Sequence, residues 1–588
     1  MRWSNIVLIR NTCFSLLIGL GGLCVINIYY MHQFFALNGY MESELFLYSI
    51  PVNIFITFFD FFLLFLLFSF ISALRLKFAL SLSYIATFLL SFVNVFYGRF
   101  FSQYLPFSAI EQITSLGDGI VVDSMLAGFL WSDLYYLISP LIAVYIMIRC
   151  RSYEYKMTLR HIILIIIVQI SSLLGVFCSY STYHLCNSTC RNNYELFKNR
   201  QKEILFNPLE RKDALPNITR YHAGLIRPFV SDLIDYILPY RLSYEQSNLL
   251  EKEYNNHNIR KTTNQSNPQI KNVVFILLES FLSASSDLIV DNKRITPFLD
   301  SLKHSDDVYY NGNVHSNISI GESGDGQLIY MTGLLPLRTK ISVGEAKKDT
   351  LPGLPSLLKS KYHILRTEIV IPSNPGLWQQ ESMNKVYGID YCYSQNDVEG
   401  EQMRDDVVFK LARNTLKNVN ESFFSMVLSF STHQPYRKFI DETFKLRCDT
   451  LPQPYLVYLN ACHFLDKQIR LYFDDLKAKD IYNNSLIVIA SDHQPHMEML
   501  GMHGRISDNL PLFIIHGNIN NNAYIGECNQ LDVYTTILDV LNINNNWLGL
   551  GNTLLNPLYI NSVSEKKYEM SEWIIRGNYF RYLNRTNK

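Results

Sequence analysis

The sequence lacks an excess of charge of either sign. Its 588 residues hold 52 lysines and arginines against 52 aspartates and glutamates, so net charge gives no support for binding nucleic acid or an acidic polymer. Disordered chains have few hydrophobic residues, whereas 48% of the residues here are hydrophobic and 14% are aromatic. The composition predicts a folded protein with no nucleic-acid partner.

Charged residues are scarce in residues 1–180, which hold nine basic and eight acidic side chains. A helix that crosses a bilayer needs about 20 apolar residues. Five segments meet this requirement, at about 11–31, 46–74, 78–98, 126–148 and 161–181. We therefore predict a five-helix transmembrane domain over residues 1–181. The first segment is expected to be a helix, since its apolar run exceeds that of a signal peptide and no small-residue cleavage site follows it.

Lysine and arginine in the short loops predict the orientation of these helices. Basic residues lie before the first segment and after the second and fourth, whereas the alternate loops hold only Arg99. We expect a cytoplasmic N-terminus in a multi-pass cytoplasmic (inner) membrane protein, with the chain after about residue 182 in the periplasm or outside the cell. Asp60 and Asp133 lie within or at the edge of apolar segments, and we interpret both as acids paired within the helices or at the interface.

The remaining chain is more polar and divides into three predicted parts. Residues 182–268 are expected to form a linker with short helices, in which Cys186 and Cys190 form a local disulfide or remain free thiols. Residues 269–556 alternate short apolar runs with helical segments, which predicts an α/β domain with a largely parallel central sheet. Residues 557–588 are expected to form a final strand or a tail. The predicted strands are 273–279, 363–371, 423–430, 485–491 and 511–517, and the clearest helices are 296–304 and 458–476.

Polar residues with metal-binding chemistry follow two of these strands. Glu279 ends the run VVFILLE, and Asp492 and His493 end SLIVIASDH. Ligands gather at the carboxyl ends of parallel strands, so the three side chains predict a mixed oxygen and nitrogen metal site. Ser323, in GESGD, follows a turn and begins a helix-like run, where a metal or base would activate it as a nucleophile. Taken singly, each feature is also typical of a helix cap or a Gly/Ser loop.

Together these residues resemble the lipoteichoic acid synthase-like family of membrane phosphoglycerol transferases, a sulfatase-like branch of the alkaline phosphatase superfamily. The resemblance extends over the whole chain and includes RFFSQYLPF…SLGDG at 99–119. It implies five membrane helices, an extracytoplasmic domain of alkaline phosphatase/sulfatase-like fold, and a nucleophile that is also a metal ligand. The implied metal ligands are Glu279, Ser323, Asp492 and His493, for one divalent ion: Mn²⁺ in the first place, with Zn²⁺ or Mg²⁺ as alternatives.

The resemblance also nominates residues on the substrate side. His433, in STHQPY, matches a family histidine and is expected to bind the phosphate or protonate a leaving oxygen. Trp378 matches a family tryptophan, and His503 resembles a phosphate-side histidine of the related phosphoethanolamine transferases. The chain departs from the family at the nucleophile, where it has Ser323 in place of threonine; Ser319 is a less favoured candidate for the same role. It also has Gln380 and Ile371 in place of an arginine and a histidine.

The implied function is a metal-dependent membrane transferase that moves a phosphoglycerol group from a phospholipid donor to a glycan or lipid acceptor through a phospho-serine intermediate. The altered substrate side keeps a phosphoethanolamine transferase as the alternative. A phosphodiesterase or other hydrolase comes next, and a non-catalytic polymer-binding membrane protein last. Sulfatase activity is not expected, because Asp325 and Gln327 replace the proline and arginine of the signal that converts a cysteine or serine to formylglycine.

Overall fold

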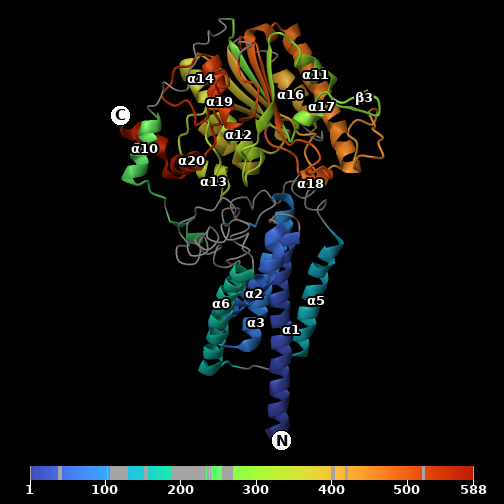
Figure 1. Ribbon diagram of the computed structural model, residues 1–588, viewed down its shortest axis with the longest axis vertical. Helices are drawn as coiled ribbons and strands as arrows, with labels where there is room; N and C mark the ends of the chain where they lie inside the picture. Colours follow the sequence, from blue (N-terminus) through green and yellow to red (C-terminus); the bar gives the residue numbers. More distant parts are fainter. Residues whose placement is uncertain are drawn as a thin grey trace. The chain divides into compact units, whose positions relative to one another are not determined.

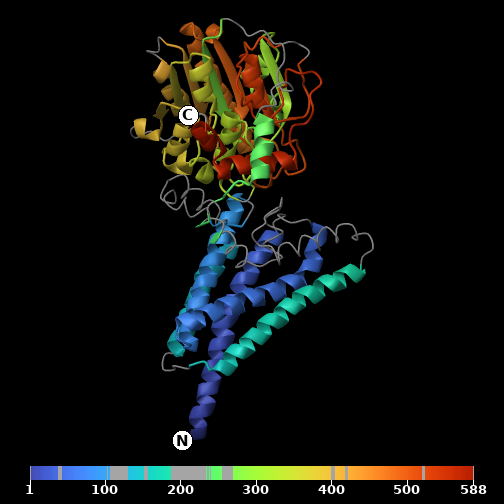
Figure 2. The same cartoon turned by 90° about the vertical axis from the view of Figure 1, so that its left-hand side faces the viewer.

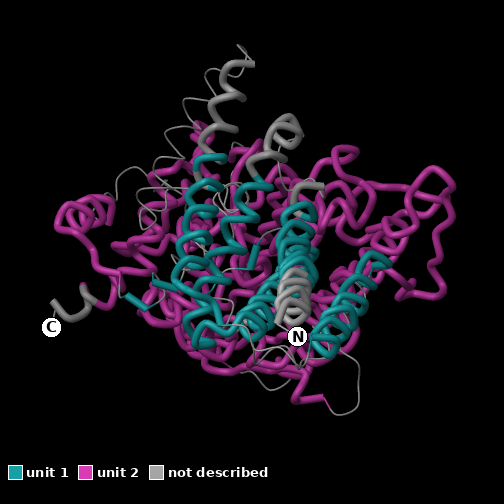
Figure 3. The backbone as a smooth tube through the Cα atoms, turned by 90° about the horizontal axis from the view of Figure 1, so that it is seen from below, with its two compact units in different colours: residues 1–110, 125–239 teal, residues 111–124, 240–588 magenta. Residues whose placement is uncertain are grey.

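The computed structural model describes the chain in two compact units, coloured separately in Figure 3. Residues 1–110 and 125–239 form the first unit, and residues 111–124 and 240–588 form the second. The structure describes residues 2–37, 43–101, 104–105, 107, 130–150, 156–186, 233–234, 237–238, 240–254, 269–338, 340–398, 404–416, 421–519 and 523–586. Cys190 and most of the predicted 182–268 linker lie outside these residues, as does most of the 99–119 segment.

The first unit consists of long apolar helices, which Figures 1 and 2 show from two sides. They are α1 (Arg2–Leu37), α2 (Ser43–Ile71), α3 (Leu76–Phe101), α5 (Leu134–Arg149, preceded by the short η2, Trp131–Asp133) and α6 (Leu159–Cys186). Within the described residues, four segments are long and apolar enough to cross a membrane: Ser15–Phe34, Asn53–Ile71, Leu76–Arg99 and Trp131–Arg149. The fifth predicted span lies in α6, where Leu159–Ser172 is a shorter apolar stretch, so the count of five stays a prediction.

The helices of the first unit pack around α1, which contacts α2, α3 and α5, while α6 packs against α2. A buried ion pair joins two of them: Arg99 at the end of α3 binds Asp133 through two hydrogen bonds of 2.6 and 2.5 Å. The Arg99 guanidinium also lies over the rings of Phe34 and Phe96. Asp133 is therefore an acid paired within the helices, as expected from the sequence, and Arg99 is neutralised inside the unit.

The second unit is built on an eight-stranded sheet with the strand order β10-β4-β9-β8-β1-β7-β5-β6. Only β9 runs antiparallel to its two neighbours, so the prediction of a largely parallel sheet is confirmed. Every residue of the central strands β1 and β8 is buried, as continuous apolar runs in a sheet covered on both faces must be. The strands are β1 (Asn272–Leu278), β4 (Val308–His315), β5 (Arg366–Val370), β6 (Tyr391–Tyr393), β7 (Phe423–Leu428), β8 (Ser485–Ser491), β9 (Leu510–Ile515) and β10 (Cys528–Asn529).

Helices cover both faces of this sheet (Figure 1). On one face, α11, α16 and α17 pack into a core with β1, β7, β8 and β9; on the other, α12 packs against α13, α14 and α19. The helices are α10 (Tyr244–Tyr254), α11 (Pro297–Leu302), α12 (Ser323–Thr332), α13 (Ser342–Ala346), α14 (Leu354–Lys361), α15 (Gln380–Tyr387), α16 (Asp405–Thr415), α17 (Gln453–Ala478), α18 (Met497–Leu500) and α19 (Leu531–Val540), and a separate hairpin comprises β2 (Ile289–Val290) and β3 (Lys293–Arg294).

The C-terminal segment differs from its expected form. Two helices, α20 (Glu565–Gly577) and α21 (Tyr579–Thr586), stand where a strand or tail was predicted. The buried residues of α20 are Met570, Ser571, Ile574 and Ile575, which recur at the three- and four-residue spacing of a helix face. The two buried isoleucines, Ile574 and Ile575, therefore lie on one side of a helix.

We expect the Arg99–Asp133 pair to stabilise the first unit. Arg99→Ala leaves the Asp133 carboxylate buried without its main partner, and breaking a buried ion pair in this way costs about 3–5 kcal/mol. The free energy of unfolding of the full chain in detergent measures this loss. Arg149→Ala is the control, because among the described residues Arg149 has a hydrogen bond to the exposed Tyr145 hydroxyl on its own helix. Equal stability of the two variants would contradict the assigned role of the pair.

Candidate functional site

The register of two central strands brings the first site residues together. β1 and β8 are parallel neighbours, and Leu278 lies opposite Ser491. The next residues, Glu279 and Asp492, therefore leave their strands at the same level of the sheet's carboxyl edge. This is the edge at which ligands bind in open α/β sheets, and His493 follows directly.

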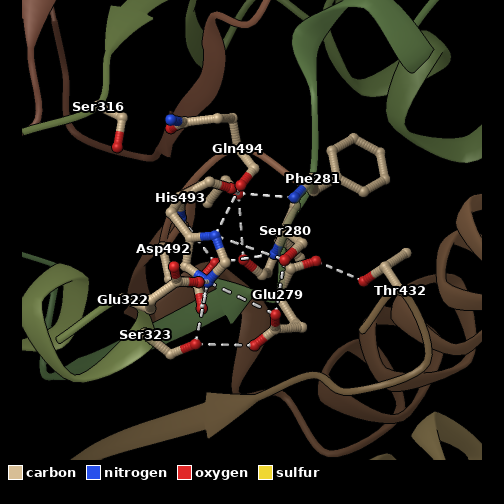
Figure 4. Close-up of polar contacts among 12 residues, drawn as sticks. Glu279, Ser280, Phe281, Ser316, Glu322, Ser323, Thr432, Asp492, His493 and Gln494 are labelled. Carbon is tan, nitrogen blue, oxygen red and sulfur yellow. Dashed lines mark hydrogen bonds and ion pairs between the residues drawn. The ribbon is translucent and has the colours of Figure 1, made fainter. Parts of the chain in front are cut away.

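Glu279, Asp492 and His493 form a buried cluster whose ligand atoms all lie within 4.8 Å of one another. His493 Nε2 is 3.6 Å from Glu279 Oε1 and 3.7 Å from Asp492 Oδ2. The hydroxyl of Ser323 points into the same space, 3.1 Å from Glu279 Oε2 and 3.1 Å from His493 Nε2 (Figure 4). The structure thus brings together the four residues that the sequence nominated as metal ligands.

A backbone contact sets the orientation of the His493 ring. Its Nδ1 lies 2.7 Å from the carbonyl oxygen of Gln494, and since a carbonyl can only accept, Nδ1 carries a proton. Once Nε2 loses its own proton, its lone pair faces Ser323 and the two carboxylates. Partners of this kind on the second ring nitrogen are typical of metal-binding histidines.

Ser280 fixes both carboxylates. Its backbone N–H donates to Asp492 Oδ1 at 2.8 Å, and its hydroxyl donates to Glu279 Oε1 at 2.6 Å. To do both, Ser280 takes a backbone conformation with φ of 49°, which non-glycine residues rarely adopt. Backbone strain of this kind persists where the surrounding structure holds it, often at functional sites.

The cluster carries more negative charge than its surroundings balance. Burial, and then the adjacent Glu279 carboxylate, raise the pKa of Asp492 to about 8. Burial opposes protonation of His493, but Asp492, Glu279 and Glu322 together raise its pKa to about 9. Burial likewise opposes ionisation of Glu279, yet His433 and His493 lower its pKa on balance. A proton on His493 therefore supplies positive charge that a cation could supply instead.

The donor set fits a divalent cation. Two carboxylates, one imidazole nitrogen and one hydroxyl converge from three segments of the chain, and oxygen with nitrogen ligation suits Mn²⁺, Mg²⁺ or Zn²⁺. A divalent ion would displace the protons on His493 and Asp492 and remove the repulsion between the two carboxylates. The residues present therefore match the predicted metal site in kind and in position.

A turn clamped by Asp325 presents Ser323. Asp325 Oδ2 accepts hydrogen bonds from the backbone N–H groups of Ser319 (3.0 Å) and Gly321 (2.9 Å), and burial raises the pKa of Asp325 to about 6. Ser323 is the first residue of α12, and Ser319 meets Asp325 through its backbone. Of the two serines, only Ser323 has described hydrogen bonds to the cluster, which favours it over Ser319 as the nucleophile.

The first turn of α12 approaches the Asp492 backbone closely, and a glycine permits this. A Cβ atom built on Gly326 would lie 2.4 Å from the carbonyl oxygen of Asp492. No side chain fits at that distance, so any larger residue must push α12 away from the strand end. The placement of the Ser323 hydroxyl beside Glu279 and His493 depends on this contact.

The substrate-side residues are only partly brought to the cluster. His433 follows β7, stacks on Phe430 with ring centroids 5.4 Å apart, and lowers the Glu279 pKa by its charge. Trp378 lies in η5 (Leu377–Gln379). The neighbouring Gln380 donates to Gln327 Oε1 of α12 at 2.9 Å and to Asn384 Oδ1 at 2.7 Å, so a neutral amide network stands where the resemblance implies an arginine.

Two further histidines are placed differently from one another. His503 is 75% exposed and pairs with Glu498, its Nδ1 3.2 Å from the carboxylate. His496 is largely buried, and its Nε2 lies 3.5 Å from Glu322 Oε2. Glu322 was not singled out from the sequence, although its place directly before Ser323 in GESGD is a visible signal.

Comparison with known proteins agrees with this fold. Residues 271–543 match the family model described as Sulfatase. Lipoteichoic acid synthase 2 of Bacillus subtilis is 27% identical over 294 residues, which are 46% of this chain and 45% of that protein. The lipoteichoic acid synthase of Staphylococcus aureus (strain USA300) is 23% identical over 431 residues, 70% of this chain and 62% of that protein. The chain thus spans less than two thirds of the length of either relative.

A solved structure extends the likeness in fold to the membrane region. The integral membrane lipooligosaccharide phosphoethanolamine transferase A of Neisseria meningitidis superposes with a TM-score of 0.55 at 12% identity, over 92% of this chain and 96% of that one. Residues 271–543 therefore form a sulfatase-like domain, which follows an N-terminal membrane region in the sequence. The resemblance to the lipoteichoic acid synthase-like family is confirmed.

The contact at Gly326 generates a test of the site geometry. In Gly326→Ala the new methyl group meets the Asp492 carbonyl, so we expect about 1–3 kcal/mol of lost stability and a weakened affinity for Mn²⁺. Gly324→Ala is the matched control on the same helix turn, since its Cβ would meet only Val343 at an ordinary 3.5 Å. Thermal unfolding and Mn²⁺ titration of both variants measure the effect. Similar behaviour of the two would show that the close approach is not needed.

Proposed function

We propose that this protein is a cation-dependent membrane transferase that moves a phosphoglycerol group from a phospholipid to a glycan or lipid acceptor through Ser323. The observation that supports it most directly is the position of the Ser323 hydroxyl, 3.1 Å from both Glu279 and His493 at the start of a helix. A serine so placed meets two requirements of a nucleophile, an activating partner and an electrostatic environment for an anion.

The reaction takes place in two displacements. Ser323 Oγ loses its proton and forms a bond to phosphorus, the bond from phosphorus to the diacylglycerol oxygen breaks, and that oxygen takes up a proton. The acceptor hydroxyl then loses its proton and attacks the same phosphorus, the bond to Ser323 Oγ breaks, and Oγ takes up a proton again. Splitting one difficult transfer into two is the advantage of covalent catalysis.

The residues of the chain have separate roles in this scheme. Glu279, Asp492, His493 and Ser323 would hold the ion, with Mn²⁺ proposed first and Zn²⁺ or Mg²⁺ as alternatives. When bound, it would lower the pKa of the serine hydroxyl and offset charge on the phosphoryl oxygens. His433 is proposed to bind the phosphate or protonate the leaving oxygen, and Trp378 and His503 to contact the substrate.

The membrane region supports a lipid donor. An enzyme acting on a soluble ester would need no more than a simple tether, whereas four segments among the described residues are long and apolar enough to span a bilayer. The distribution of lysine and arginine in the short loops supports a cytoplasmic N-terminus and a sulfatase-like domain in the periplasm or outside the cell. We include five crossings and this orientation in the proposal.

A phosphoethanolamine transferase is the second candidate, and one observation favours it. Gln380 is held by Gln327 and Asn384 at the position where the resemblance to phosphoglycerol transferases implies an arginine. A neutral amide cannot neutralise a phosphate or replace the bidentate contacts of a guanidinium. The head group that enters the site therefore differs in at least one contact from that of the phosphoglycerol transferases.

The proposal predicts a covalent adduct on one serine. The purified full chain is incubated with Mn²⁺ and vesicles containing phosphatidylglycerol and phosphatidylethanolamine, and its intact mass and peptides are then measured. We expect an added glycerophosphate on Ser323, absent from Ser323→Ala, and a fall in head-group turnover of about a thousandfold or more in that variant. Ser319→Ala, in the same turn, is the control and should retain the adduct.

Each other outcome has a defined meaning. A phosphoethanolamine adduct on Ser323 would replace the first candidate with the second. Release of free head group without an acceptor product would indicate a hydrolase. Neither adduct nor turnover, with the cation bound, would contradict the transferase proposal and favour a non-catalytic role.

A further inference from the structure

Glu322 has a conformation that requires an explanation. It is the residue before Ser323, at the N-terminal cap of α12, and its backbone has φ of 45° and ψ of −120°. A residue with a side chain is rarely found in this conformation, because the backbone there is strained. Glycine would adopt this conformation without strain, yet the chain has a glutamate.

The Glu322 side chain is directed to the metal-binding cluster. Its Oε2 lies 3.9 Å from His493 Nε2, the nitrogen that faces Ser323, Glu279 and Asp492. It is the third carboxylate near this nitrogen, and 21% of its side chain is exposed. Figure 4 shows Glu322 beside Ser323 and Asp492, on the same side of the His493 ring as the serine hydroxyl.

His496 is a second partner of this carboxylate. Its Nε2 lies 3.5 Å from the same oxygen, Glu322 Oε2. His496 is the cap residue of α18, and it lies three positions after His493 on the segment that leaves β8. The segment that supplies two of the metal ligands therefore also supplies a partner for Glu322, an arrangement common for residues behind metal ligands.

We propose that Glu322 is a further carboxylate ligand of the divalent cation and that His496 positions it. The inference deepens the proposed function, on which it rests only in requiring a divalent cation at the cluster. Glu322 Oε2 is already 3.9 Å from a ligand nitrogen, so a rotation of its side chain would allow it to help hold the ion. The ligand set then becomes three carboxylates, one hydroxyl and one imidazole.

An oxygen-rich set of this kind has a consequence for metal preference. Carboxylate ligands suit hard cations such as Mg²⁺ and Mn²⁺, which accept six ligands, whereas Zn²⁺ is commonly satisfied by four. Glu322 should therefore contribute more to Mn²⁺ binding than to Zn²⁺ binding. The proposal accounts for why a strained position next to the nucleophile holds a charged residue.

The test measures cation affinity without any lipid. The full chain in detergent is stripped of metal, and the dissociation constants of Mn²⁺ and Zn²⁺ are determined by competition with a chelating indicator. In Glu322→Gln we expect the Mn²⁺ affinity to fall about 10–100-fold and the Zn²⁺ affinity to fall less. Glu442→Gln is the control, because Glu442 is 72% exposed and pairs with Lys445, and it should bind both ions like the unaltered protein.

The role of His496 is tested in the same assay. His496→Gln keeps a donor close to the position of Nε2 and should retain most of the Mn²⁺ affinity, whereas His496→Ala should lose part of it. General damage to the fold would lower the affinities for Mn²⁺ and Zn²⁺ equally, and His496→Gln and His496→Ala would then bind Mn²⁺ equally weakly. The ratio of the Mn²⁺ affinity to the Zn²⁺ affinity therefore separates a positioning role from misfolding.

Two results would overturn the inference: Mn²⁺ affinity of Glu322→Gln within twofold of the unaltered protein, or equal losses for Mn²⁺ and Zn²⁺. Failure of the proposed function is distinguishable from either. If Glu322→Gln weakens Mn²⁺ selectively while Ser323 forms no adduct with any donor, the ligand assignment stands and the transferase proposal falls. If Ser323 forms the adduct but the cation affinities of Glu322→Gln are unchanged, the transferase proposal stands and the ligand assignment of Glu322 falls.

Discussion

The arrangement of the site depends on two carboxylates, Glu279 and Asp492, buried side by side at the ends of adjacent parallel strands. Burial, and then the like charge of Glu279, raise the pKa of Asp492 to about 8, because both disfavour its ionised form. A proton on His493 and the hydrogen bonds donated by the hydroxyl and backbone N–H of Ser280 offset part of this charge. A divalent cation would satisfy the same electrostatic requirement more completely.

Ser323 is brought to this charge cluster by local backbone features. Gly326 lets α12 approach the Asp492 carbonyl, Asp325 clamps the preceding turn, and Glu322 and Ser280 both adopt positive φ. Together they place the Ser323 hydroxyl at hydrogen-bond distance from Glu279 and His493. The strained backbone at Glu322 and Ser280 costs stability, and the contacts around it hold the site in this geometry. Strain of this kind is common at functional sites.

Much of the architecture could be predicted from the sequence, since the fully buried strands β1 and β8 and the mostly buried strand β7 are largely apolar runs. By contrast, β4 (VYYNGNVH) carries polar residues and β10 has only two residues, so the apolar pattern predicted neither strand. Apolar content also does not show that β9 runs antiparallel. Glu279, Asp492 and His493 could be nominated as site residues because they lie at the ends of predicted strands. The approach of Glu322 and His496 depends on a positive φ at Glu322 and on how the chain turns after β8, which no pattern of residue types specifies.

The most direct test of the central claim, that these residues form a cation site around a serine nucleophile, is the anomalous scattering of crystals of the full chain grown with Mn²⁺. The account predicts one strong peak about 2.2 Å from carboxylate oxygens of Glu279 and Asp492, from His493 Nε2 and from Ser323 Oγ. The absence of a peak among these atoms, with Mn²⁺ bound elsewhere on the molecule, would contradict it.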